Sequence, residues 1–205
     1  MTLPAHPDVQ IESEQTAWSG RFSIDVVKFR QRRFDGAMSA TRTWELFRRG
    51  RAAAVLPYDP VTDQVVLIEQ FRLPALAAGM APVMVEVPAG LCDGDEDPAQ
   101  TAAREVTEET GLHVRDLELV CDILLTPGGS DERCTLFVGR TDAPAGPVGN
   151  AGLASENEDI RVRLHDAQTV IAAAVRGEYP NSVTAIALLW LAAQRESLRA
   201  RWLAA

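Results

Sequence analysis

Short apolar runs separated by polar turns fill the first part of the chain, which is the pattern of β-strands. Within residues 8–50, QIESE and FSIDVVKFRQRRF precede a turn at Asp35-Gly36, and a second run ends at Arg49-Gly50. An Asp-Gly turn between two strand-like runs is typical of a hairpin or meander. The pattern therefore predicts an antiparallel strand region at the N-terminus.

From Ala52 onward the apolar runs become nearly continuous, as in strands that are covered on both faces. AAAVLPYDPVTDQVVLIEQF predicts two strands around the turn DPVTD, and MVEVPAG predicts a shorter strand that ends at Pro88-Ala89-Gly90. Further strands are predicted near 117–125, 133–139 and 159–164, with a loop at 143–153. These runs indicate a buried central sheet.

Helical patterns interrupt these strands at 98–110, near 166–176 and near 182–202. The first has clear ends, because Asp97 is an N-cap followed by Pro98, with Gln100 completing a capping box, and Gly111 is a stop signal. The last follows an Asn181-Ser182 cap, and its apolar stretch AIALLWLAA suits packing against the sheet or a partner. Alternating strands and helices predict an α/β or α+β fold.

Composition narrows the class of protein. The 205 residues, 46% hydrophobic and 24% charged, suit one globular domain at 51–205 with an N-terminal extension at 1–50. A chain of this length buries roughly 70% of its unfolded surface and needs no disulfide or structural metal. The net charge of -9 argues against a nucleic-acid partner, because phosphate-backbone affinity comes from clustered Lys and Arg.

Cysteine usage and the chain start bear on localisation. Cys92, Cys121 and Cys134 lack CxxC spacing and are predicted to be small buried hydrophobes in a reducing compartment. The segment MTLPAHPDVQIESEQ lacks the basic region and apolar run of a signal peptide, and no apolar run reaches 18 residues. We therefore expect a cytoplasmic protein with no membrane span.

The helix predicted at 98–110 carries Glu105, Glu108 and Glu109 on one face near its C-terminal end. Like charges at this spacing repel by about 0.2–0.5 kcal/mol per pair, and each opposes the helix dipole by roughly 0.3–1 kcal/mol. A solvated acidic face is one interpretation. The acidic loop LCDGDEDPAQ leads directly into the helix, however, which favours a hard divalent cation such as Mg²⁺ or Mn²⁺.

Nine constrained positions occur at fixed spacing around this helix. Five residues lead from Gly90 to Glu96, seven more lead to Arg104-Glu105, and VTEETGL follows. The segment resembles the complete Nudix box, G-x5-E-x7-R-E-U-x-E-E-x-G-U, in which U is apolar. The resemblance implies a Nudix hydrolase of the α/β class: an α/β/α sandwich around a mixed sheet, here with an additional N-terminal antiparallel strand region. Such enzymes bind divalent metal and hydrolyse a nucleoside diphosphate linked to another moiety.

Five further blocks, VLIEQFR, EVPAG, LTPGGSDE, SENEDIRV and NSVTAIALLWL, resemble bacterial ADP-ribose pyrophosphatases, and Pro127 lies 15 residues beyond Leu112 as in that subfamily. The resemblance implies Mg²⁺-dependent hydrolysis of ADP-ribose to AMP and ribose 5-phosphate, with Mn²⁺ as a substitute. Alternatives are another nucleoside diphosphate sugar such as GDP-mannose, oxidised nucleoside triphosphates, or a non-catalytic metabolite sensor. The complete set of box acids disfavours the sensor.

The resemblance also implies roles for individual residues. Metal ligands would be Glu105, Glu109, the backbone carbonyl of Ala89 and Glu158, whereas Glu108 would be a ligand or support one. Arg104 would orient Glu105 or a loop acid. The general base would be Glu156, on a loop after the box that closes over bound substrate.

Substrate contacts are predicted in three segments. Arg72 would recognise phosphate or ribose, and Glu132 with Gly129 in LTPGGSDE would contact the terminal ribose. An adenine platform is expected from Arg21, Phe22 and Trp44, although related enzymes carry an arginine near the position of Trp44. The resemblance further implies a homodimer with exchanged N-terminal strands.

Charge is distributed unevenly in a way that agrees with these roles. Residues 86–109 contain eight acids and one arginine, whereas residues 21–51 contain nine basic side chains and three acids. The acidity is therefore concentrated where a cation would bind, and the basic N-terminal segment is free to face substrate or a partner subunit.

Overall fold

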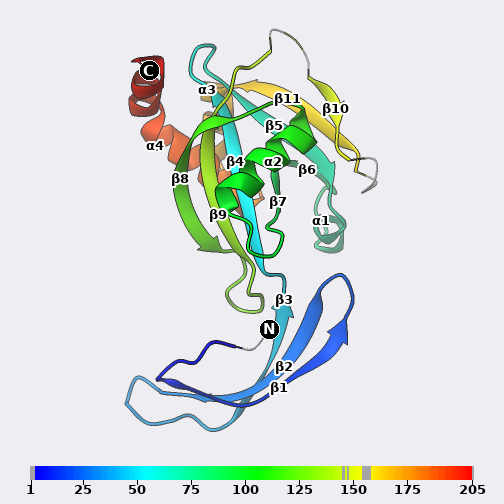
Figure 1. Ribbon diagram of the computed structural model, residues 1–205, viewed down its shortest axis with the longest axis vertical. Helices are drawn as coiled ribbons and strands as arrows, with labels where there is room; N and C mark the ends of the chain where they lie inside the picture. Colours follow the sequence, from blue (N-terminus) through cyan, green and yellow to red (C-terminus); the bar gives the residue numbers. More distant parts are fainter. Residues whose placement is uncertain (1–2, 145, 147, 154–157, 205) are drawn as a thin grey trace. The chain divides into compact units, whose positions relative to one another are not determined.

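The computed structural model describes residues 3–144, 146, 148–153 and 158–204 (Figure 1). The chain forms two compact units. The N-terminal unit comprises Met1–Gly50 together with Leu124–Arg133, and the main unit comprises Arg51–Ile123 and Cys134–Ala205. The sequence did not indicate that the segment Leu124–Arg133 joins the N-terminal strands.

The N-terminal unit contains a three-stranded antiparallel sheet in the order β1-β2-β3. Its strands are β1 (Val9–Ser19), β2 (Ser23–Gln31) and β3 (Arg42–Arg48). Gly36 adopts a φ of 86° in the connection from β2 to β3, which is the conformation that makes glycine suitable there. Leu124–Arg133 is attached to β3 by a hydrogen bond from the Phe47 N–H to the Gly129 carbonyl at 2.8 Å. The predicted antiparallel strand region is thereby confirmed.

The main unit is built on an eight-stranded sheet in the order β10-β11-β5-β4-β9-β8, with β6 paired to β5 and β7 paired to β4. The strands are β4 (Arg51–Asp59), β5 (Gln64–Phe71), β6 (Val83–Glu86), β7 (Ala89–Leu91), β8 (Arg115–Leu124), β9 (Arg133–Arg140), β10 (Gly149–Ala151) and β11 (Ile160–Asp166). The near-continuous apolar runs correspond to β4 and β5, whose central residues are fully buried as expected.

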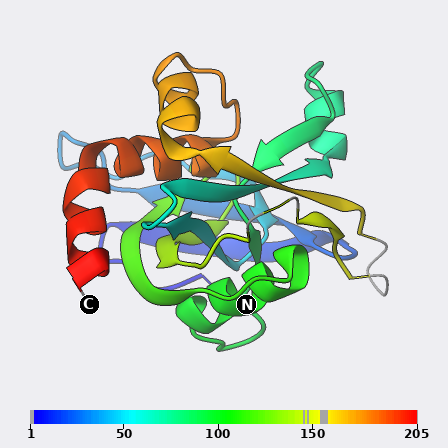
Figure 2. The same ribbon diagram turned by 90° about the horizontal axis from the view of Figure 1, so that it is seen from above.

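Helices cover both faces of this sheet. They are α1 (Leu73–Ala77), α2 (Pro98–Thr110), α3 (Ala167–Val175) and α4 (Ser182–Ala204). Figure 2 shows α2 on one side of the sheet and α3 with α4 on the other. Under α2, Ala102 and Val106 pack against Ala53, Val55 and Phe137 of the sheet. This arrangement confirms the expected α/β/α sandwich, and among the described residues no helix is long and apolar enough to cross a membrane.

Helix α2 begins and ends where its local signals predict. The Asp97 carboxylate accepts a hydrogen bond from the Ala99 N–H at 2.8 Å, so it caps the first turn at the second helical residue. Gly111 ends the helix with a φ of 71°, and its N–H donates to the Thr107 carbonyl.

Three expectations were wrong in detail. The segment MVEVPAG is not one strand, because β6 pairs with β5 whereas β7 pairs with β4, and Pro88, which has no N–H, lies between them. The loop at 143–153 contains the short strand β10, which exists only through its pairing with β11. Cys134 is buried, but Cys92 and Cys121 are only half-buried, and none of these three described residues forms a disulfide.

Candidate active site

Strand β7 and helix α2 come together at Gly90. A Cβ atom at this position would lie 1.8 Å from Glu105 Oε1, well inside any possible contact distance. The glycine therefore allows the carboxylate to lie directly against the strand backbone. The first glycine of the sequence motif has this steric role.

Glu109 is the most deeply buried acid of the cluster, with 3% of its surface exposed. Its Oε2 accepts a hydrogen bond from the Ala89 N–H at 3.0 Å. Burial, with further repulsion from Glu105 and Glu158, raises the pKa of Glu109 to about 8. Burial also raises the pKa of Glu105. Carboxylates in such surroundings are stabilised by a nearby cation.

Arg104 supplies the positive charge that the structure places in the cluster. Its Nη1 donates to Glu105 Oε1 and to Glu108 Oε2, both at 2.8 Å. Its Nε and Nη2 reach Glu96 at 3.4 and 3.3 Å, and this contact holds the pKa of Glu96 low. Arg104 thus contacts Glu105 and a loop acid.

Glu158 approaches the same cluster from the segment that precedes β11. Its Oε2 accepts a hydrogen bond from the Leu153 N–H at 3.1 Å, and its charge raises the pKa of both Glu105 and Glu109. Glu156 lies outside the described residues.

The donor set fits a hard divalent cation. Glu105, Glu109 and Glu158 are carboxylates, and Ala89 offers a backbone carbonyl, which are the oxygen ligands that Mg²⁺ and Mn²⁺ prefer. In the part of the chain that the structure describes, no three Asp, Glu, His or Cys side chains already enclose a metal position. Glu105 is instead bonded to Arg104, whose guanidinium occupies the place of a counter-ion.

Arg72 lies at the edge of this cluster in the main unit. It precedes α1, and its backbone N–H donates to the Pro82 carbonyl at 2.7 Å. Its Nε donates to Glu86 Oε2, also at 2.7 Å. The positive charge of Arg72 lowers the pKa of Glu109, so the guanidinium is within electrostatic range of the buried acids.

Two of the candidates in the N-terminal unit, Phe22 and Glu132, contact Arg49, a residue that the sequence did not single out. The Arg49 guanidinium lies 4.3 Å from the ring centre of Phe22, and that of Arg21 lies 5.7 Å from it. Arg49 Nη2 also donates to Glu132 Oε1 at 2.9 Å. Arg49 was missed because it lies in the run RRGR, where no local feature distinguishes one basic residue from the next.

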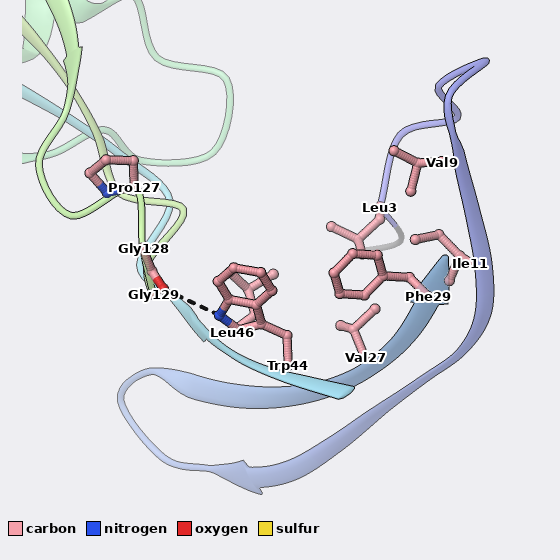
Figure 3. A pocket seen from close by; sticks show the side chains of 10 residues that line it. All are labelled: Leu3, Val9, Ile11, Val27, Phe29, Trp44, Leu46, Pro127, Gly128 and Gly129. Atoms are coloured by element: carbon pink, nitrogen blue, oxygen red, sulfur yellow. Dashed lines mark hydrogen bonds between the residues drawn. The ribbon is translucent and has the colours of Figure 1, made fainter. Parts of the chain in front are cut away.

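Trp44 and Gly129 lie elsewhere in the same unit. The indole stacks on Phe29 at 5.9 Å and donates from Nε1 to the Gly128 carbonyl at 3.2 Å (Figure 3). Both candidates line an apolar cavity of about 280 Å³, to which Phe22, Arg21 and Glu132 do not contribute. The full lining is Leu3, Val9, Ile11, Val27, Phe29, Trp44, Leu46, Pro127, Gly128 and Gly129.

An acidic helix thus lies on an α/β sandwich, with the Glu105 carboxylate held against a glycine-containing strand, and its oxygen donors suit a divalent cation. The family model of the NUDIX domain matches residues 48–181. The chain therefore belongs to the NUDIX family, as its sequence motif predicted.

Individual relatives extend this result over nearly the whole chain. The ADP-ribose pyrophosphatase of Escherichia coli (strain K12) is 40% identical over 195 residues, which is 95% of this chain and 93% of the relative. The ADP-ribose pyrophosphatase of Haemophilus influenzae is 35% identical over 198 residues, covering 95% and 91%.

Two other matches are more distant. A GDP-mannose pyrophosphatase of Yersinia pestis (strain Pestoides F) is 32% identical over 140 residues, covering 67% of this chain and 70% of the relative. A crystal structure of an ADP compounds hydrolase superposes with a TM-score of 0.68 at 20% identity and covers 97% of this chain and 98% of the other. At that identity the superposition supports the fold alone.

Proposed function

We propose that this protein hydrolyses the pyrophosphate of ADP-ribose to AMP and ribose 5-phosphate with Mg²⁺, for which Mn²⁺ can substitute. The observation that carries the proposal is the 40% identity over 95% of the chain to an ADP-ribose pyrophosphatase. The GDP-mannose pyrophosphatase aligns with only 67% of the chain, so that activity is the second candidate.

The reaction adds one water molecule across the pyrophosphate. The water oxygen bonds to one phosphorus atom, and the bond from that phosphorus to the bridging oxygen breaks. The bridging oxygen stays on the other phosphate, and the proton lost by water passes to a base. A bound divalent cation neutralises phosphate charge, aligns the reacting groups and lowers the pKa of the attacking water.

Residues of α2 and β7, together with Glu158, would hold that cation in this proposal. Glu105 and Glu109 provide carboxylate oxygens, Ala89 provides its carbonyl oxygen, and Glu158 completes the set. Glu105 would then give up its hydrogen bond to Arg104 in order to hold the cation. Arg104 keeps its bonds to Glu108 and Glu96, so it continues to anchor the acidic loop to the helix.

Glu156 is the proposed general base. Its support is its place in the sequence, two positions before the proposed ligand Glu158, which would bring it close to the attacking water. A base on a loop can approach the water when substrate is bound and exclude bulk solvent at the same time.

Substrate contacts are proposed separately for each unit. Arg72 in the main unit binds a phosphate oxygen, since a guanidinium is suited to bidentate phosphate contacts. In the N-terminal unit, Phe22 and Arg21 form the adenine platform, and Glu132 accepts hydrogen bonds from ribose hydroxyls. Arg49 adds to this platform because it contacts both Phe22 and Glu132. Trp44 and Gly129 line the neighbouring apolar cavity, which makes them the less favoured substrate contacts.

A homodimer with exchanged N-terminal strands is part of the proposal. Its support is the exposed apolar surface of the small sheet, where Ile11, Trp18 and Ile24 are 40%, 55% and 36% exposed. Light scattering after gel filtration should give twice the chain mass of 22.3 kDa. A monomeric mass together with full activity would contradict the dimer.

The proposed activity is tested by release of AMP from ADP-ribose with Mg²⁺. GDP-mannose, ADP-glucose and NADH are compared at equal concentration, and Mn²⁺ replaces Mg²⁺ in a parallel series. We expect the highest kcat/KM for ADP-ribose and no turnover with excess chelator. A higher kcat/KM for GDP-mannose would assign the second candidate instead.

A further inference from the structure

Residues outside the sequence motif hold Arg72 in place. We propose that Glu86 and Asn181 are positioning residues that fix the guanidinium of Arg72 for the pyrophosphate of the substrate. The inference rests on the proposed function, because it deepens the role given there to Arg72. It adds the first turn of α4, on the opposite face of the sheet from α2, to the parts of the chain that shape the site.

Glu86 is a buried carboxylate with one donor for each oxygen. Its Oε2 accepts from Arg72 Nε and its Oε1 accepts from Asn181 Nδ2, both at 2.7 Å. Only 7% of Glu86 is exposed, whereas the Arg72 side chain is 41% exposed. The acid is therefore fixed inside the protein, and the arginine extends from it toward solvent.

The orientation of Asn181 is itself determined by a second contact. Its Oδ1 accepts from the Thr184 N–H at 2.9 Å and so caps the first turn of α4. An amide group that uses its oxygen as a cap presents its NH₂ group on the other side. That NH₂ group meets Glu86, so the helix cap and the carboxylate contact use opposite ends of one side chain.

A separate hydrogen bond prevents α4 from shifting relative to Glu86. The hydroxyl of Thr184, a fully buried residue, accepts from the Val87 N–H at 3.1 Å. Val87 directly follows Glu86 in the chain. The two connected residues, Asn181 at the start of α4 and Glu86 at the end of β6, are thus held in fixed positions relative to one another.

The hydrogen bond to Glu86 leaves the terminal nitrogen atoms of Arg72 available for substrate. A guanidinium has five N–H donors in a planar fork. Glu86 uses the Nε edge, and it is the one carboxylate with which the structure pairs Arg72 within the described ranges. The terminal nitrogen atoms can therefore bind phosphate oxygens in an orientation that is fixed before substrate arrives.

The main test is a double-mutant cycle on Glu86 and Arg72. Glu86→Gln, Arg72→Ala and the double variant are assayed for kcat and KM on the substrate that the unsubstituted protein hydrolyses best. We expect Glu86→Gln alone to raise KM about tenfold, the size expected for one charged hydrogen bond, and to leave the pH profile of kcat unchanged. In the Arg72→Ala background the same change should alter KM less than about twofold, because its target is gone. Effects that multiply in the double variant would overturn the inference.

Asn181 offers a variant that separates positioning from helix capping. Serine can still cap α4 but has no NH₂ group to donate to Glu86. Asn181→Ser should raise KM several-fold with little change in Tm, whereas Asn181→Ala should also lower Tm. A KM for Asn181→Ser equal to that of the unsubstituted protein would remove Asn181 from the proposal.

Asp63→Asn is the matched control. Asp63 also ties α4 to the sheet, through Arg195, and the change also replaces a carboxylate by an amide. It should lower Tm without raising KM. An increase in KM like that of Glu86→Gln would mean that loosening α4 is sufficient, and would overturn the inference. The proposed function would fail separately, if the protein preferred a substrate other than ADP-ribose. The test of Glu86 does not depend on that preference, because Arg72 is assigned to the pyrophosphate, which all these substrates share.

Discussion

At the scale of single residues, Gly90 determines whether Glu105 can occupy its place. Its backbone is not in the left-handed region, so alanine is permitted there by conformation and excluded only by contact with Glu105. We expect Gly90→Ala to displace this carboxylate and to lower kcat/KM by about 100-fold or more, with weakened metal activation, since Glu105 is a proposed metal ligand. Activity is measured against Mg²⁺ concentration.

Gly146→Ala is the control for this change, because a Cβ atom there meets nothing within 4 Å and the backbone again has no positive φ. It should leave activity and metal dependence unchanged. If Gly90→Ala keeps the metal affinity of the unsubstituted protein, then the close approach of β7 to Glu105 has no functional role.

Glu156 and Glu158 are two residues apart, and their proposed roles predict different kinetics. Glu156→Gln should lower kcat by about two orders of magnitude or more while KM and metal dependence stay nearly the same, as expected for loss of a general base. Glu158→Gln should instead shift activation to higher Mg²⁺ concentration. Both are measured by initial rates over a matrix of substrate and metal concentrations. If Glu156→Gln leaves kcat unchanged, the base lies elsewhere.

The sequence predicted residues whose relation is local and missed residues whose relation is tertiary. Glu105 and Glu109 lie four positions apart on one helix, so helical geometry alone places them on one face. Asn181 and Glu86 are separated by 95 positions and meet only because α4 packs beside β6. No spacing rule connects such residues. EVPAG and NSVTAIALLWL resemble the family as separate blocks, and neither block indicates that its first residue meets the other.

At the scale of elements, the same distinction separates α2 from β10 and α1. Capping and stop signals flank α2 within one residue at each end, and its bounds were predicted correctly. β10 has three residues and depends on pairing with β11, whereas α1 has five residues, none of them buried. Elements this short are stabilised by their surroundings, so their own sequence carries little signal.

The N-cap of α2 can be tested separately from the acids that the helix carries. Asp97→Ala removes the acceptor of the Ala99 N–H and should lower the free energy of unfolding by about 1 kcal/mol. Asp97→Ser, which keeps a capping oxygen, should lose much less. Urea unfolding followed by circular dichroism measures both. Equal losses in the two variants would show that the Asp97 charge, rather than its capping bond, stabilises the helix.

At the scale of the whole molecule, the net charge of -9 describes neither of the two units. Buried acids with raised pKa values belong to the main unit, whereas the arginines that surround Phe22 belong to the N-terminal unit. The net charge is therefore an average over two units whose charged groups differ in kind.

Acid stability is a property of the whole main unit, and it depends partly on Asp63. Arg195 Nε on α4 donates to this carboxylate at 2.9 Å across 132 positions of sequence, and the Tyr58 hydroxyl donates at 2.7 Å. The Arg195 hydrogen bond holds the pKa of Asp63 below its ordinary value of 3.8. A lowered pKa means that the contact stabilises the fold fully above the unfolded pKa, and that this stabilisation is lost as pH falls through the lower pKa of the folded protein.

Asp63→Asn should therefore be less stable than the unsubstituted protein at pH 7. The difference should begin to shrink below about pH 4, where Asp63 gains a proton in the unfolded chain before it does in the folded protein. Asn is tolerated at the φ of 61° found here. Burial lowers the pKa of His165, so stability also declines as pH falls below about 6.5, but this loss is common to both proteins and cancels in the difference. Urea unfolding of both proteins at pH 7, 5 and 3 measures this difference in the free energy of unfolding. A difference at pH 3 as large as that at pH 7 would mean that Asp63 acts through packing and hydrogen-bond geometry, independently of its charge.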